Sequence, residues 1–117
     1  PEAVLLRALE PLEGITLMRE RRANASIADA LLCRGPANLC RAMGIDRGLN
    51  GADLTAGLIV LLAAPSVRAR QIAASPRIGV AYAGADAALP WRFFIRDAAA
   101  VSHVPAPVDA TRSARRA

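Results

Sequence analysis

An arginine stands in the middle of an apolar run, Val4-Leu5-Leu6-Arg7-Ala8-Leu9, which Glu10 and Pro11 follow. A run of this kind, ended by a proline, is typical of a strand buried on both faces. Burying a guanidinium is costly unless acceptors meet it, so Arg7 is either half of a structural ion pair or part of a functional site. Glu10 would face the opposite side of such a strand, and the partner of Arg7 must therefore come from elsewhere.

Two further places could hold a ligand. A helix is predicted over Pro36–Met43, ending at Gly44, with Asn38 and Arg41 on its outer face. The free N–H groups at its start, with a basic side chain nearby, can hold a phosphate, although most helix starts hold only water. Gly79 interrupts a β-like segment, which indicates either an ordinary bulge or a place where another group approaches the backbone.

Composition is consistent with nucleic-acid binding but does not establish it. All 15 basic residues are arginine, against 10 acidic residues, which gives a net charge of +5. Arginine suits phosphate recognition, yet an alanine-rich, lysine-free chain can equally reflect GC-rich codon usage. The longest apolar run, 56–64, is about half the length of a bilayer span, so no membrane helix is predicted.

The two cysteines do not indicate a metal site. Cys33 and Cys40 lie across Gly35-Pro36 without a CxxC pair or a nearby histidine, so we expect reduced thiols, no metal and no cofactor. The absence of a secretory signal agrees with a cytoplasmic protein. Because the chain enters its first predicted strand almost at once, we also expect that a preceding part is missing.

The elements that must position these residues predict an α+β class, with a mostly antiparallel sheet and short helices packed on it in a single domain incomplete at its N-terminus. Asn24-Ala25-Ser26 could cap the second of the predicted helices. Residues 103–117, which include His103, are expected to form a disordered basic tail. Besides the elements above, the pattern predicts helices over Ile15–Arg22 and Ile27–Cys33, strands over Leu58–Ala63 and Pro90–Asp97, and a loop over Ala85–Leu89.

Three segments together resemble the alkyladenine (3-methyladenine) DNA glycosylase family. They occur in the family's order and, with the chain between them, cover about Val4 to Ser102, so residues 1–102 are interpreted as the C-terminal portion of a methylpurine DNA glycosylase domain. The segments are Val4-Leu5-Leu6-Arg7-Ala8-Leu9-Glu10-Pro11-Leu12-Glu13-Gly14, Gly35-Pro36-Ala37-Asn38-Leu39-Cys40-Arg41-Ala42-Met43-Gly44-Ile45, and Pro76-Arg77-Ile78-Gly79-Val80 with Pro90-Trp91-Arg92-Phe93.

The resemblance implies a base-excision repair enzyme that flips an alkylated or deaminated purine out of double-stranded DNA and hydrolyses its N-glycosidic bond with water. The family's general base is a glutamate in a front half that this chain lacks, so the chain alone is expected to be inactive. Such an enzyme would work in the cytoplasm on the bacterial nucleoid.

The resemblance also implies roles for individual residues. Arg7 is similar to the arginine that helps the absent glutamate hold the attacking water, and Ile78 is similar to the residue whose backbone carbonyl contacts that water. Gly79 would let the base approach the backbone.

DNA-backbone contacts are implied at the helix start formed by Gly35 and Pro36. Many relatives have a basic residue at the position of Asn38, so Arg34 or Arg41 would carry more of the phosphate contact. Arg77 and Arg92 are either further backbone contacts or members of ion pairs at the sheet edge.

Two other functions remain open at this stage. The fold also resembles the C-terminal domain of methionyl-tRNA formyltransferases, so the chain could be a non-catalytic nucleic-acid-binding module, with salt-sensitive binding and no preference for lesions. It could also be a subunit that pairs with a separately encoded front half, which predicts a large exposed apolar face.

Overall fold

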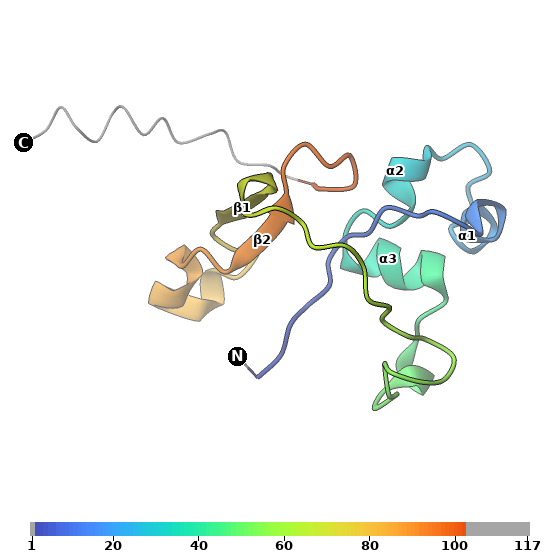
Figure 1. Cartoon of the computed structure of the whole chain (residues 1–117), viewed down its shortest axis with the longest axis horizontal. Coiled ribbons are helices and arrows are strands. Elements are labelled where there is room, and N and C mark those ends of the chain that lie inside the picture. The colour runs from blue at the N-terminus through green and yellow to red at the C-terminus, as the bar shows by residue number, and fades with distance from the viewer. Residues whose placement is uncertain (1, 103–117) are drawn as a thin grey trace, which may run out of the picture.

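The computed structural model describes residues 2–102, and its α-helices precede its two strands. Figure 1 shows the α-helices on one side of the molecule and the small sheet on the other, which confirms the α+β class with an antiparallel sheet. The elements are α1 (Ile15–Arg21), α2 (Asp29–Leu32), α3 (Pro36–Met43), η1 (Arg47–Leu49), η2 (Ala69–Gln71), β1 (Ile72–Ser75), η3 (Ala81–Ala88) and β2 (Arg92–Ile95), where η marks a 3-10 helix.

Helix α3 has the boundaries that the sequence predicts, because both of its end signals are local. Pro36 takes the first helical position, where its missing N–H is no loss. Gly35 precedes it with φ 97° and ψ 151°, a conformation that residues with a Cβ avoid. Gly44 ends the helix in the left-handed conformation, and its N–H bonds back to the Arg41 carbonyl.

The predicted second helix is shorter than expected. It covers only Asp29–Leu32, and its N-cap is Ala28, without a side-chain cap. Asn24 Oδ1 instead accepts hydrogen bonds from the backbone N and the Oγ of Ser26, both at 3.1 Å. The predicted cap is therefore wrong, and these two residues form a local turn before the helix.

The helices form the main core of the described residues. Leu32, Cys33, Leu39 and Ala42 are buried together, and α1 supplies Ile15 and Met18 beside them. Arginine side chains at the end of α1 hydrogen-bond to backbone carbonyls of α2 and α3, which holds the three helices together. Arg21 Nη1 donates to the Ala42 carbonyl at 3.2 Å, and Arg22 Nη1 donates to the carbonyls of Leu31, at 3.1 Å, and Leu32.

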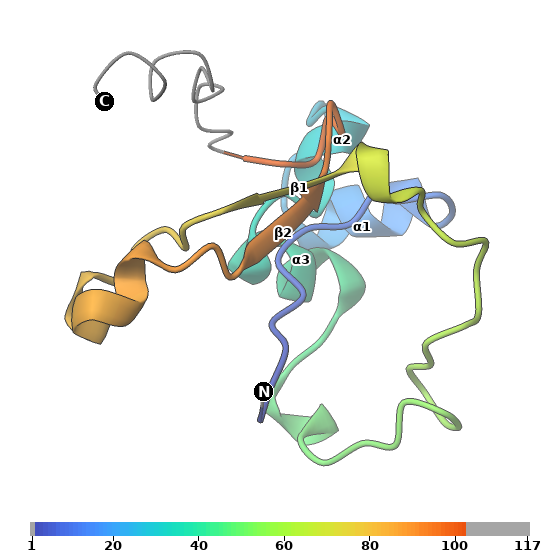
Figure 2. The same ribbon diagram turned by 60° about the vertical axis from the view of Figure 1, so that its left-hand side comes forward.

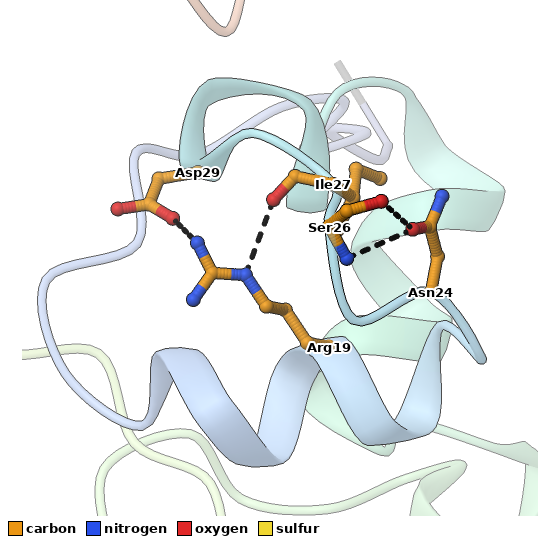
Figure 3. A network of polar contacts seen from close by, with 5 residues as sticks. All are labelled: Arg19, Asn24, Ser26, Ile27 and Asp29. Atoms are coloured by element: carbon orange, nitrogen blue, oxygen red, sulfur yellow. Dashed lines mark hydrogen bonds and ion pairs between the residues drawn. The ribbon is translucent and has the colours of Figure 1, made fainter.

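Arg19 makes the third link from α1, as Figure 3 shows. Its Nε donates to the Ile27 carbonyl at 3.1 Å, and its Nη2 pairs with Asp29 Oδ1 at 2.5 Å. Both groups of the ion pair remain partly exposed, so the pair adds modestly to stability. Its geometric effect is to fix the start of α2 against α1.

The two cysteines differ in reactivity. Cys33 is fully buried and Cys40 is partly exposed, and both thiols are free. Burial raises the pKa of the Cys33 thiol, while the charge of Arg22 lowers it in part. We expect iodoacetamide to alkylate Cys33 slower than Cys40, on the order of tenfold or more at pH 8, as peptide mass spectrometry would measure. Equal rates would contradict the buried assignment.

The same shift sets the sign of a pH effect on stability. A thiol whose pKa is higher in the folded than in the unfolded chain contributes stability at pH values below the unfolded pKa. That contribution is lost as the pH rises through the raised folded pKa, so Cys33 makes the chain less stable on the alkaline side.

Strands β1 and β2 form the sheet, with Ile72 opposite Ile95 and Ser75 opposite Arg92. The predicted strand over Pro90–Asp97 is confirmed in its central part. The segment that connects the two strands contains η3 (Ala81–Ala88), so the predicted loop over Ala85–Leu89 is wrong for most of its length. Figure 2 shows η3 projecting from the far end of the sheet.

Two predicted buried strands are absent from residues 2–102. Val4–Pro11 forms one isolated bridge, between Ala8 and Arg34, and its leucines are exposed. Leu58–Ala63 is irregular, and Leu58 is 96% exposed. Both predictions are wrong for a shared reason. Strand formation requires neighbouring strands, and no other strand of residues 2–102 pairs with either segment.

No helix of residues 2–102 is long and apolar enough to cross a membrane. The predicted tail and His103 lie outside the described residues.

Candidate active-site cavity

Residues from four separate parts of the chain line one open cavity of about 640 Å³. It lies where the N-terminal segment, the start of α3, the turn after β1 and the end of the described chain meet. The lining residues are Arg7, Arg34, Gly35, Ile78, Gly79 and Ser102. Five of these six were singled out from the sequence, so the cavity brings together the implied water site and part of the implied DNA contact.

Gly79 provides an opening in the cavity wall. Its φ of +73° disfavours any residue with a Cβ, and a Cβ built there would meet no atom within 4 Å. The close approach of a base to the Gly79 backbone stays a prediction. Ile78, just before it, is partly exposed in the same turn.

The cavity is positively charged. Arg7 and Arg34 line it, and none of its six lining residues is acidic. The Arg7 guanidinium makes no hydrogen bond or ion pair within residues 2–102. Its charge is close enough to Arg92 to lower the pKa of that guanidinium, although burial is the larger cause. An anion in the cavity would relieve this repulsion.

Arg92 is buried inside the sheet and holds the end of the described chain. Its Nη1 donates to Ser75 Oγ at 3.4 Å, its Nη2 donates to the Ser102 carbonyl, and it stacks on Phe94 with 4.8 Å to the ring centre. These contacts place the Arg92 guanidinium within the protein. The DNA contact and the edge ion pair proposed for Arg92 from the sequence both stay predictions.

Arg34, which lies just before α3, also binds a backbone carbonyl near the end of the described chain. Its Nη2 donates to the Val101 carbonyl at 3.1 Å, while its Nε is buried without a hydrogen-bond partner among residues 2–102. The two arginines thus bind successive carbonyls, Val101 and Ser102, and join the helices to the sheet across the cavity. Ser102 was missed from the sequence, because its role comes from a backbone carbonyl that no residue pattern marks.

The remaining residues with an implied DNA contact, Asn38, Arg41 and Arg77, differ in their surroundings. Asn38 is engaged locally, since its Nδ2 donates to the Arg34 carbonyl at 2.8 Å. Arg41 is exposed on α3. Arg77 lies over Trp91, 5.3 Å from the ring centre, and Nη2 approaches the Asp86 carbonyl at 3.4 Å. Of these three, Arg41 alone projects into solvent from the helix that begins at the cavity.

The link through Arg34 leads to a specific expectation. Arg34→Ala should remove the hydrogen bond to Val101 and lower the free energy of local opening by about 1 kcal/mol, roughly a fivefold rise in amide exchange over residues 98–102. Hydrogen exchange with mass spectrometry measures this. Arg41→Ala, which changes an exposed arginine of the same region, is the control, and equal exchange in both variants would contradict the assignment.

No group of three or more His, Cys, Asp or Glu side chains that could hold a metal ion occurs among the residues that the structure describes.

The sequence of this chain is similar to those of known proteins. A family model described as methylpurine-DNA glycosylase (MPG) matches residues 1–99. A protein of Methanocella arvoryzae named "Putative 3-methyladenine DNA glycosylase" is 47% identical over 103 residues, which are 87% of this chain and 50% of the relative.

Two other proteins of that name show the same coverage. The Leifsonia xyli protein is 47% identical over 86% of this chain and 47% of its own length. The Chlorobium luteolum protein is 41% identical over 86% and 48%. The chain thus spans about half the length of the curated relatives it matches.

Proposed function

Since the chain belongs to the methylpurine-DNA glycosylase family, we propose that it supplies one half of a base-excision site for damaged purines in double-stranded DNA. The domain flips an alkylated or deaminated purine out of the duplex, at a cost of about a few kcal/mol, and hydrolyses its N-glycosidic bond with water. The half of the family domain that this chain does not span supplies the remainder of the site. Such an enzyme works on the bacterial nucleoid.

The observation that carries this proposal is the shared cavity. Arg7 and Ile78, which the family resemblance assigns to the attacking water, line it together although they are far apart in sequence. The Arg7 guanidinium donates to the water, and the Ile78 backbone carbonyl accepts from it. Gly79 leaves room for the flipped base.

Because no acidic residue lines the cavity, the catalytic base must come from the half of the domain that this chain does not span. A general base is required to activate water, and a glutamate there would lie beside the Arg7 guanidinium. A nearby cation lowers the pKa of a carboxyl group, so the glutamate stays ionised and able to accept a proton. Glu10 and Glu13 are exposed and do not line the cavity, so neither replaces it.

DNA phosphates contact the start of α3 in this proposal. The backbone N–H groups that follow Gly35 and Pro36 carry the positive end of the helix dipole. Arg41 adds a charged side chain from the exposed face of α3. Arg34 helps indirectly, because it shapes the adjacent cavity, and Asn38 fixes the helix start through the Arg34 carbonyl.

The test uses the chain joined to the half of the Methanocella arvoryzae relative that it does not span, called here the joined protein. The joined protein should release hypoxanthine or 3-methyladenine from a duplex with one lesion under single-turnover conditions. The purified chain alone should release nothing above a buffer control. Release by the chain alone would contradict the proposal, and so would a folded joined protein that binds duplex but releases no base.

A further inference from the structure

Arg34 connects three of the four parts of the chain that enclose the cavity. It lines the cavity directly before the start of α3. Its backbone forms the isolated bridge with Ala8, in the N-terminal segment, and its Nη2 donates to the Val101 carbonyl at 3.1 Å, near the end of the described chain. One partly buried residue therefore holds the N-terminal segment, the helix start and the chain end together.

The bridge fixes the backbone beside Arg7. Ala8, which pairs with Arg34, is the next residue along the chain, and Leu9 N donates to the Cys33 carbonyl at 3.4 Å. Cys33 is fully buried in the helical core, so this attachment point is well fixed. Figure 1 shows the N-terminal segment running between the α-helices and the sheet. The position of the Arg7 guanidinium thus depends on the backbone just before α3.

The side chain of Arg34 links the N-terminal segment to the sheet. Val101, whose carbonyl it binds, precedes Ser102, and the Ser102 carbonyl accepts from Arg92 Nη2. Arg92 lies in β2, which pairs with β1, and the turn that carries Ile78 follows β1 directly. A continuous path of hydrogen bonds and backbone pairing thus joins the two sides of the cavity between which the attacking water would be held.

We propose that Arg34 is a positioning residue for base release, which sets the distance between the Arg7 guanidinium and the Ile78 carbonyl. This inference rests on the proposed function, in which those two groups hold the attacking water. Arg34 touches neither the water nor the base. It acts through the N-terminal segment and the chain end, and an error of about 1 Å in such a spacing can cost on the order of a hundredfold in rate.

A phosphate contact, which the family resemblance implies, is the alternative role for Arg34. The side-chain contacts favour positioning, because Nη2 is used by the Val101 carbonyl and Nε is buried without a hydrogen-bond partner among residues 2–102. Asn38 Nδ2 donates to the Arg34 carbonyl at 2.8 Å, which fixes the backbone from which the side chain extends. Loss of a phosphate contact lowers duplex affinity and its salt dependence, whereas loss of positioning lowers the rate on bound duplex.

The experiment measures single-turnover release of hypoxanthine by the joined protein, with the enzyme in saturating excess over the duplex. Arg34→Met keeps the apolar stem but removes the donors, so it should slow release by about tenfold or more while the Kd for the duplex changes by less than about twofold. Arg34→Lys keeps a donor that can reach the Val101 carbonyl and should recover part of the lost rate. Arg47→Ala, in the exposed part of η1, is the control and should release base at the parent rate.

A double variant separates positioning from general destabilisation. If Arg34 acts through Arg7, removal of both side chains should cost little more than removal of Arg7 alone. Arg7→Ala combined with Arg34→Met should therefore release base within about twofold of the Arg7→Ala rate. Denaturation midpoints from circular dichroism check that each variant is folded, and if Arg34→Met does not fold, the same cycle is measured with Arg34→Lys.

The possible results separate this inference from the proposed function. A folded joined parent that binds duplex but releases no base contradicts the proposed function and this inference with it. A parent that releases base overturns this inference alone if Arg34→Met keeps the parent rate at saturation, with or without weaker duplex affinity. Losses that multiply in the double variant have the same consequence.

Discussion

Arg7→Ala in the joined protein should slow release of hypoxanthine by tenfold or more, which corresponds to about 1.4 kcal/mol in the barrier. The physical reason is that the guanidinium orients the attacking water and stabilises the ionised glutamate beside it. Single-turnover kinetics on a duplex with one lesion measure the chemical step directly. Duplex affinity should change little, because Arg7 lies in the cavity and not on the exposed face of α3.

Two other variants test whether the slower release is specific to the Arg7 guanidinium. Arg7→Lys keeps the charge but loses the fixed fork of donors, so it should recover only part of the rate. Arg47→Ala removes an exposed arginine of η1, away from the cavity lining, and should leave the rate unchanged. A wild-type rate in Arg7→Ala would remove Arg7 from the water site.

Leu32→Ala should destabilise the chain by about 2–5 kcal/mol. Leu32 is fully buried between the helices, where it is one of the two largest completely enclosed side chains of the described residues. Its neighbours are held in place by arginines that bind backbone carbonyls, so they cannot collapse freely into the space left by the side chain. Urea denaturation followed by circular dichroism measures the loss.

Leu31 is the matched control for this variant, since it precedes Leu32 in α2 and is 39% exposed. Leu31→Ala should cost less than about 1 kcal/mol. Equal losses at the two positions would contradict the assignment of the core.

The helical part of this fold is predictable from sequence because its signals are local. Gly35, Pro36 and Gly44 fix both ends of α3 through backbone conformations that depend on a few neighbouring residues. The boundaries of α2 were less accurate, because Asn24 and Ser26 satisfy each other in a turn instead of capping the helix.

Unlike the helices, the strands were poorly predicted from the sequence. The apolar pattern of Val4–Leu9 is typical of a buried strand, but burial and pairing depend on partners elsewhere in the sequence, and residues 2–102 contain none for it. The same applies to Leu58–Ala63. An apolar pattern alone therefore does not decide whether a segment forms a strand, and both predictions are wrong for the described chain.

The candidate site was partly predictable. The resemblance singled out Arg7, Ile78 and Gly79, and the structure places all three at one cavity. The function of Arg92 could not be read from its position in a strand, because the serine hydroxyl and the carbonyl that receive its hydrogen bonds lie 17 and 10 residues away. Contacts to backbone carbonyls carry no residue signature.

The central claim is that the cavity holds the attacking water between Arg7 and the Ile78 carbonyl. A crystal structure of the joined protein on a duplex with an abasic analogue tests it most directly. We expect a water within about 2.7–3.2 Å of the Arg7 guanidinium and the Ile78 oxygen, with a glutamate of the other half beside it. A structure in which Arg7 points away from the duplex, or in which protein side chains fill the cavity, would contradict the claim.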